Sequence, residues 1–238
     1  MEKLLIILFV FISLPILAQD EKEEKEEKDN AFRIGKSPEE KADKIIKDAV
    51  ETIDGMDDPE SGIPLSLVKK SGGIIIFPKA TKTSIGVGGQ SGQGIALIRK
   101  GGGWSNPYYV KLQEISGGLQ FGVQVSEIIL LVKNPDFIKN LETADLQFGA
   151  DVNATAGPDG TNMAVDATPD FEADIYTYQK SEGLFGGVSL AGGALIFSWK
   201  LNEAEYGEET SVDKIFNLPV PYNGDIAKVL NELSKMGL

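Results

Sequence analysis

The sequence contains neither cysteine nor histidine. Without cysteine no disulfide can form, so packing alone must hold the fold together. Without histidine, a Ser-His-Asp triad and a Cys-His pair are both excluded, as is a zinc site built on imidazole or thiolate ligands. Hydrolysis by Asp or Glu stays open, but no nucleophile or oxyanion device accompanies the carboxylates. We therefore expect a protein that is not an enzyme, with no catalytic residue, no metal and no cofactor.

Aspartate and glutamate are absent from residues 61–113, although the whole chain has a formal net charge of -13. The acidic total argues against a nucleic-acid partner, because phosphate binding needs a basic surface. If neighbours in sequence stay neighbours in space, the acid-free stretch forms a basic lobe opposite an acidic remainder. Its basic residues are Lys69, Lys70, Lys79, Lys82, Arg99, Lys100 and Lys111.

A long apolar run lies at the N-terminus, where Leu4 to Leu17 stands between Lys3 and Ala18. A charged start, an apolar centre and a small residue at the cleavage point are typical of a signal peptide. The run is shorter than the roughly 20 residues that span a bilayer as a helix. We expect cleavage near Ala18 and an exported protein, periplasmic or secreted. A retained membrane anchor is the alternative.

These patterns divide the chain into three segments. Residues 1–18 are the predicted signal peptide. Residues 19–36 form a charged tether, which we expect to be disordered because its run of acids and lysines has nothing to bury. Residues 37–238 have the length of one domain with a sizeable core.

Hydrophobic periodicity predicts helices at both ends of this domain and strands between them. Ser37 and Pro38 are typical of a helix start, and one apolar stripe then runs to Gly55. Further helices are predicted over 64–70, 135–141, 213–218 and 225–236. Pro78 is expected to end a short first strand from Ile74. The other predicted strands are 84–100, 108–112, 118–125, 128–132, 146–153, 171–178, 187–189 and 194–201. The fold class is α+β, with an antiparallel, glycine-rich sheet that is strongly curved or barrel-like.

Three motifs suggest ligands, and each lacks a required part. Residues 86–92 are rich in glycine, but a strand rather than a helix follows, so no helix N-terminus meets a pyrophosphate. Residues 151–155 carry oxygen ligands at alternate positions without the glycine and glutamate of a calcium loop. Asp170, Glu172 and Asp174 alternate, which favours an exposed acidic strand face over a hydrolytic site.

Two segments place large apolar side chains beside glycines. Trp104 follows a triple-glycine turn, where we expect its ring to seal the end of the sheet. Leu184 and Phe185 are flanked by glycines, and at a hairpin tip they would contact a membrane. A loop tucked against the domain is the alternative for that pair.

Seven segments in order resemble the SYLF domain family, over a region from about Lys41 to the C-terminus. The family includes lipid- and actin-binding adaptors of fungi and animals and many exported bacterial proteins. The resemblance implies binding of phosphoinositides or other anionic lipids through basic residues in the N-terminal portion of the domain. The matching segments are Ile63–Pro78, Gly86–Gly94, Trp104–Val110, Ile115–Gln124, Ala154–Gly160, Ile175–Gly193 and Asn202–Gly207.

Two hypotheses for function therefore lead. In the first, the seven basic residues bind anionic head groups at a membrane surface, where each contributes roughly 1 kcal/mol. In the second, the protein is a cell-envelope structural or interaction module whose basic lobe meets an acidic protein partner, including another copy of itself.

Mass spectrometry of the exported protein tests the predicted processing. We expect the mature chain to begin at Gln19, because the apolar run ends in the small residue Ala18. A mature mass that still includes residues 1–18 would indicate an anchored protein.

Overall fold

The computed structural model describes residues 36–56, 61–85, 87–117, 122–160, 170–181, 183–221 and 224–236. The chain divides into an N-terminal unit, Met1–Ser37, and a domain, Pro38–Leu238, to which the following description applies. The predicted signal peptide lies outside the described residues, and so does the predicted tether apart from Lys36.

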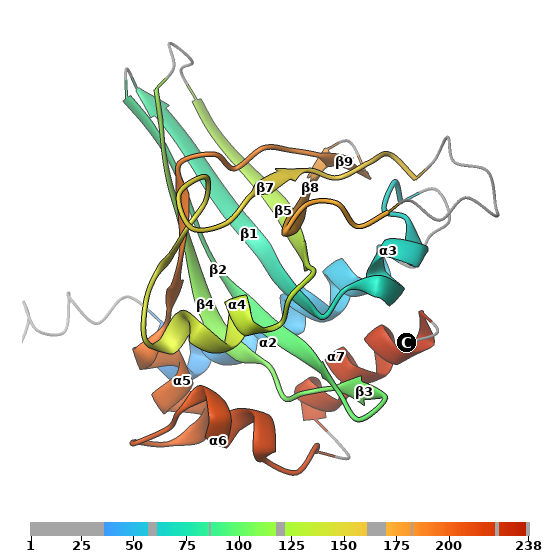
Figure 1. Ribbon diagram of the computed structural model, residues 1–238. Coiled ribbons are helices and arrows are strands. Elements are labelled where there is room, and N and C mark those ends of the chain that lie inside the picture. Colours follow the sequence, from blue (N-terminus) through green and yellow to red (C-terminus); the bar gives the residue numbers. More distant parts are fainter. Residues whose placement is uncertain are drawn as a thin grey trace, which may run out of the picture. The chain divides into compact units, whose positions relative to one another are not determined.

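A ten-stranded sheet forms the frame of the domain (Figure 1). Its strand order is β6-β10-β4-β2-β1-β5-β8-β7, with β3 paired to β2 and β9 paired to β8. The parallel pair β7–β8 makes the sheet mixed, while the other named pairs are antiparallel. The strands are β1 (Gly73–Ile85), β2 (Val87–Lys100), β3 (Gly103–Trp104), β4 (Tyr108–Gly117), β5 (Gly122–Val132), β6 (Leu146–Gln147), β7 (Ala154–Ala156), β8 (Ile175–Ser181), β9 (Leu184–Gly187) and β10 (Gly193–Phe197).

A short crossing segment forces this sheet to curl. Strands β6 and β7 lie at opposite ends of the order, yet only residues 148–153 connect them. In a flat sheet, strands about 4.8 Å apart would separate these two edges by about 34 Å. The chain from Gln147 to Ala154 reaches at most about 25 Å. The expected α+β fold with a strongly curved sheet is thus confirmed, and the crossing segment marks its enclosed, concave side.

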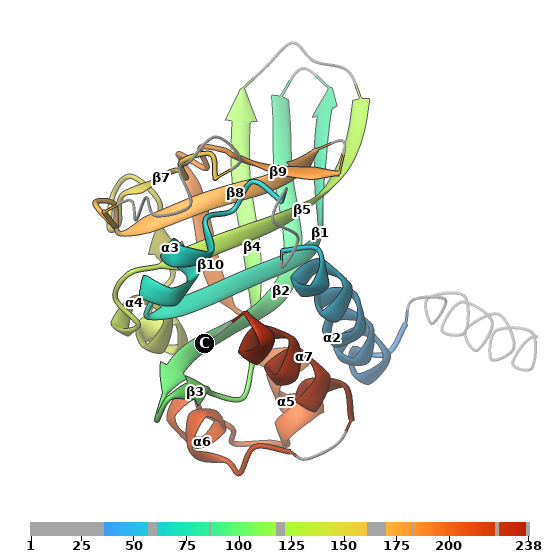
Figure 2. The same ribbon diagram turned by 90° about the vertical axis from the view of Figure 1, so that its right-hand side faces the viewer.

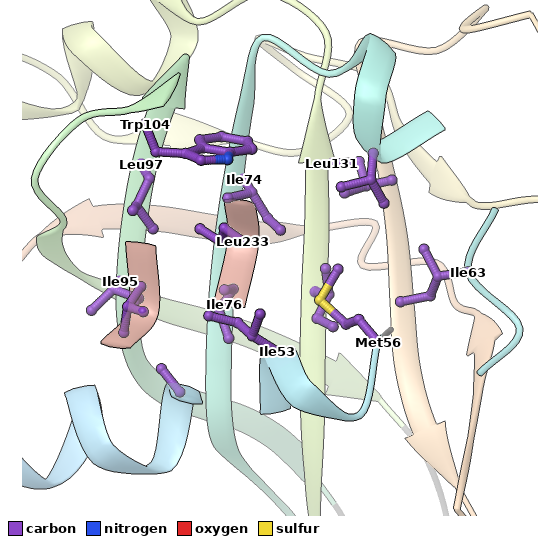
Figure 3. Packing of buried hydrophobic residues seen from close by; sticks show 14 of the residues in the cluster. Ile53, Met56, Ile63, Ile74, Ile76, Ile95, Leu97, Trp104, Leu131 and Leu233 are labelled. Atoms are coloured by element: carbon purple, nitrogen blue, oxygen red, sulfur yellow. The ribbon is translucent and has the colours of Figure 1, made fainter. Parts of the chain in front are cut away.

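Each face of the sheet has its own core, because successive side chains of a strand alternate between faces. Ile74 and Ile76 lie in the convex core, and Ile75 and Phe77 lie in the concave core. Figure 3 shows Ile53 and Leu233 from two helices over the convex side of β1 and β2. Helices α2 (Pro38–Asp54), α3 (Leu65–Lys70), α5 (Trp199–Tyr206) and α7 (Gly224–Lys235) contribute to the convex core, and α4 (Asp136–Lys139), η1 (Asn140–Glu142) and α6 (Val212–Asn217) to the concave core.

Helix α2 follows its predicted stripe. Ala42, Ile46, Ala49 and Ile53 are buried at helical spacing, so one face of the helix packs on the sheet and the other carries lysines and acids. The predicted helix starts and ends agree with the structure to within a few residues for α2, α3, α6 and α7.

Three strand predictions are wrong because they put turns and bulges at the wrong positions. Pro78 does not end β1, which continues to Ile85 through a register shift beside the proline. A bulge tolerates a residue without a backbone N–H. The predicted strand 84–100 is divided between β1 and β2, and the strands predicted at 118–125 and 128–132 form one strand from Gly122.

The later strands were predicted too long. Only two residues of 146–153 belong to β6. Asp170, Glu172 and Asp174 all precede β8, so they form no acidic strand face. Strand β10 ends at Phe197 and α5 follows, where a continuous strand was expected.

Asn202 explains the end of β10. Its side chain is fully buried; Oδ1 accepts from the backbone N of Tyr109 at 2.8 Å, and Nδ2 donates to the Tyr109 carbonyl at 2.9 Å. The amide therefore replaces a strand partner for β4 and leaves the chain free to turn into α5.

Replacing Asn202 with alanine should destabilise the domain by about 3 kcal/mol, because the buried N–H of Tyr109 would lose its acceptor and the C=O of Tyr109 would keep only the backbone N–H of Ser198, at 3.1 Å. The melting temperature should fall by roughly 6–12 °C. Asn140→Ala, at an exposed position, is the matched control and should melt like the wild type. Equal melting of the two variants would contradict the role assigned to Asn202.

Candidate functional site

The seven basic residues predicted to form one lobe are divided by the structure. They lie on both faces of the sheet and at the ends of two helices, so neighbours in sequence do not stay neighbours in space. Their positions decide which of them are available to a ligand.

Arg99 holds the C-terminal end of α3. Its Nε donates to the carbonyl of Ser71 at 2.9 Å, and its Nη2 donates to the carbonyl of Val68 at 2.8 Å. Its guanidinium carbon lies 4.5 Å from the ring centroid of Trp104, within the range of a cation–π attraction. Burial lowers the pKa of Arg99. Trp104 is only 5% exposed, in agreement with its predicted structural role.

Lys100 acts at the end of another helix. Its Nζ donates to the carbonyl of Phe216 at 2.6 Å and to Oδ1 of Asn217 at 2.7 Å. These acceptors belong to the last residues of α6, where a positive charge satisfies carbonyls that have no partner within the helix. Lys69 and Lys70 are the last residues of α3, and both are exposed.

Lys82 lies on the concave face. It pairs across β1 and β2 with Gln90, which pairs in turn with Glu114 on β4, so the three side chains share that face. Burial raises the pKa of Glu114, and the charge of Lys82 opposes the rise. Lys82 is therefore separated by the sheet from the convex-face lysines.

A groove of about 170 Å³ lies between α2 and the convex side of β1 and β2. Three lysines enter it: Lys41 and Lys44 from α2, and Lys79 from β1. The remaining lining residues are Ile45, Asp48, Pro78 and Gln93.

The bulge at Pro78 brings Lys79 into this groove. Phe77 and Ala80 both lie in the concave core although they are three positions apart, whereas strict alternation would place them on opposite faces. Pro78 is the extra residue. Lys79 consequently faces α2, and its Nζ lies 3.1 Å from Oδ2 of Asp48.

Strand register adds Lys111 to the same row. Gln93 is paired with Lys79 on one side and with Lys111 on the other. Directly paired residues share a face of the sheet, so Lys111 extends the row by one strand. We call Lys41, Lys44, Lys79 and Lys111 the basic groove.

Asp48 holds two of these lysines together. Its carboxylate lies 3.0 Å from Nζ of Lys44 as well as 3.1 Å from Nζ of Lys79. Burial acts to raise the pKa of Asp48, but the hydrogen bonds and charges of the two lysines outweigh burial and hold it below its ordinary value. The hydrogen bond to Asp48 also raises the pKa of Lys44. Both shifts favour the charged forms of Asp48 and Lys44.

Lys41 and Lys44 were absent from the predicted set. They precede the acid-free stretch and belong to a helix that was predicted from its apolar stripe. The available signal was their spacing of three residues, which places both on one side of α2 beside the buried stripe.

Exposed valines lie further along the same convex face. Val123 is 73% exposed and Val125 is 59% exposed, both on β5. Val125 pairs with Thr81 of β1, two residues from Lys79. An apolar strip therefore continues from the basic groove towards the ends of the long strands.

The predicted pair Leu184 and Phe185 is split. Both follow the turn of the β8–β9 hairpin, but Leu184 is 51% exposed and Phe185 is 3% exposed. The ring of Phe185 lies in the convex core with Nζ of Lys180 5.5 Å from its centroid. Leu184 alone is available for a surface contact.

No group of acidic side chains among the described residues is arranged to hold a metal ion. No helix in the described ranges is both long enough and apolar enough to cross a bilayer.

Comparison with known proteins gives a family match. The profile of the family Ysc84, described as "Las17-binding protein actin regulator", matches residues 113–236. That description denotes a binding protein and regulator rather than an enzyme.

Individual relatives cover more of the chain. It is 32% identical over 176 residues to SH3 domain-containing YSC84-like protein 1 of Xenopus laevis, covering 73% of this chain and 52% of the relative. For the Rattus norvegicus protein of that name, identity is 28% over 205 residues, covering 84% and 60%. LAS seventeen-binding protein 3 of Saccharomyces cerevisiae is 29% identical over 159 residues, covering 65% and 34%. The chain thus spans little more than half the length of the two vertebrate relatives.

Replacing Arg99 with alanine should destabilise the domain by about 2–3 kcal/mol, because two carbonyls at the end of α3 lose a charged donor and Trp104 loses its cation. Lys69→Ala removes an equal charge at an exposed position nearby and should leave the melting temperature unchanged. Thermal unfolding of both variants measures the difference. An unchanged melting temperature for Arg99→Ala would return Arg99 to the candidate ligand contacts.

Proposed function

Because the chain belongs to the Ysc84/SYLF domain family, we propose that it is a non-enzymatic binding module whose basic groove takes the head group of an anionic lipid. The observation that carries this proposal is the convergence of Lys41, Lys44, Lys79 and Lys111 at the groove between α2 and the sheet.

The charge of the groove favours an anionic ligand. Three lysines and one aspartate line it, and Lys111 lies in the adjacent position on β4. Each ammonium group near an anionic membrane contributes roughly 1 kcal/mol. Asp48 fixes Lys44 and Lys79 in position, so less side-chain freedom is lost when a phosphate binds.

The valines beside the groove favour a membrane surface as the source of that anion. Exposed Val123 and Val125 lie on the same convex face as Lys79. A surface that combines cationic and apolar side chains binds a bilayer through both head groups and acyl chains.

Export, which we propose from the signal-peptide pattern of residues 1–18, fits a ligand of the cell envelope. The anionic lipids of a bacterial envelope offer phosphate oxygens of the chemistry required. The family description names Las17 binding and actin regulation, and we propose neither for this chain.

A protein partner is the second candidate, and one observation favours it. A groove of about 240 Å³ on the other side of α2 carries Asp43, Glu205 and Asp225. Burial raises the pKa of Glu205. A partner that meets both grooves would need patches of both signs, which is a property of protein surfaces rather than of lipid head groups.

Vesicle sedimentation tests the lipid proposal. The purified mature protein should bind vesicles that contain phosphatidylglycerol and ignore vesicles of phosphatidylcholine alone. Lys41→Gln/Lys111→Gln should weaken binding about 30-fold, the equivalent of two lysines at roughly 1 kcal/mol each. Binding should also weaken as salt rises, because exposed charges are screened over about 8 Å at physiological ionic strength.

Three further variants sharpen this experiment. Lys133→Gln/Lys200→Gln removes two exposed charges elsewhere and is the matched control. Lys69→Gln/Lys70→Gln tests the exposed pair at the end of α3. Asp48→Asn should tighten binding, since removing a negative charge from the groove outweighs the lost positioning of Lys44 and Lys79. If folded protein does not sediment with vesicles at any salt concentration, the lipid proposal is rejected in favour of the protein partner. If Lys133→Gln/Lys200→Gln weakens binding as much as Lys41→Gln/Lys111→Gln, the groove is rejected as the binding site.

A further inference from the structure

Among the residues that the structure describes, the first residues of β5 have a strand partner on one side only. Gly122 to Ser126 are in register with Ser84 to Ala80 of β1, whereas β8 joins the other side of β5 only from Ile128 onward. Figure 2 shows β1, β2, β4 and β5 projecting beyond the helices, with β4 at one edge of the projection and β5 at the other. Half of the backbone N–H and C=O groups of this free edge point away from the sheet.

This edge lacks the usual protection against strand pairing. Edge strands are commonly guarded by lysine, proline, bulges or shortness. Residues 122–126 read GVQVS, with no charge and no proline, and their register with β1 is continuous. The next residue, Glu127, is paired with Lys180. By contrast, the terminal strands β6 and β7 have two and three residues.

We propose that this free edge of β5 pairs with the same edge of a second copy of the chain, joining two sheets about a twofold axis at Gln124. Two antiparallel strands related by a twofold axis must have that axis perpendicular to the sheet, and a residue on the axis faces itself. Centring on Gln124 makes Val123 face Val125 of the second copy, within the exposed residues 122–125, and Ser126, only 7% exposed, lies at the closed end of the edge.

The segment is self-complementary in this register. Two pairs of β-branched valines form on the convex face, and each such cross-strand pair stabilises by about 0.2–1 kcal/mol. No like charges meet at the edge. Both copies carry a formal charge of -13, so long-range repulsion opposes pairing and salt relieves it. Dimerisation should therefore strengthen as salt rises, which is opposite to the salt dependence of the proposed lipid binding.

The twofold axis also fixes the relative orientation of the two copies. Because it is perpendicular to the sheet, both convex faces point the same way. Two basic grooves then face one plane, which increases avidity for any surface that binds one of them. Dimerisation itself requires no lipid and is tested without it.

Sedimentation analysis of the purified mature protein over a range from about 1 to 500 µM tests the proposal. So short an edge buries less than the area of a standard interface, so we expect a reversible monomer–dimer equilibrium within that range. Val125→Lys should weaken dimerisation at least tenfold, since a lysine on an edge blocks pairing. Val220→Lys, at a valine 47% exposed and away from β5, is the matched control and should dimerise like the wild type.

Cross-linking tests the register. The sequence has no cysteine, so Gln124→Cys introduces a single thiol in each copy, on the twofold axis. Directly paired residues of antiparallel strands have Cα atoms about 4.5–5.5 Å apart, a distance that suits a disulfide. Oxidation should give a covalent dimer for Gln124→Cys and little for Val220→Cys. A protein that stays monomeric throughout the range, or a dimer that Val125→Lys leaves intact, would overturn the proposal.

Discussion

The crossing segment between β6 and β7 is the constraint on which the rest of the structure depends. It is too short to connect the edges of a flat sheet, so it gives the sheet an inside and an outside. The inside is filled by its own apolar core together with α4 and α6, and the long helices are left to cover the outside. The basic groove lies where α2 meets the convex face.

The sequence was most informative where one physical signal acts alone. The Ser37-Pro38 start and the apolar stripe of α2 predicted that helix almost to the residue, because capping and helical periodicity are local. Glycine-rich alternation predicted the curved sheet. Strand ends were predicted poorly, since they depend on distant partners: β10 ends where the side chain of Asn202 takes over the backbone of Tyr109, and no local pattern near Phe197 encodes that contact.

The candidate site was recovered in part for a similar reason. Charge composition identified Lys79 and Lys111, which do lie together, but only strand register shows that Gln93 stands between them. The same composition grouped them with Arg99 and Lys100, whose charges hold helix ends instead. Lys41 and Lys44 were missed because they come from a part of the chain where acids are abundant. A charge count along a sequence combines residues from both faces of a sheet, whereas a binding surface is formed by residues of one face.

Pro78 has a consequence for how this strand tolerates changes of length. Elsewhere in β1, losing or gaining one residue would invert every side chain on one side of the change, exchanging core residues for surface ones. At the bulge the extra residue has no partner position in the neighbouring strand. Without it, Phe77 and Lys79 would be adjacent and would still face opposite sides of the sheet, as normal alternation requires. Residue 78 is therefore the point of β1 at which an insertion or deletion could be accommodated while Lys79 still faced α2.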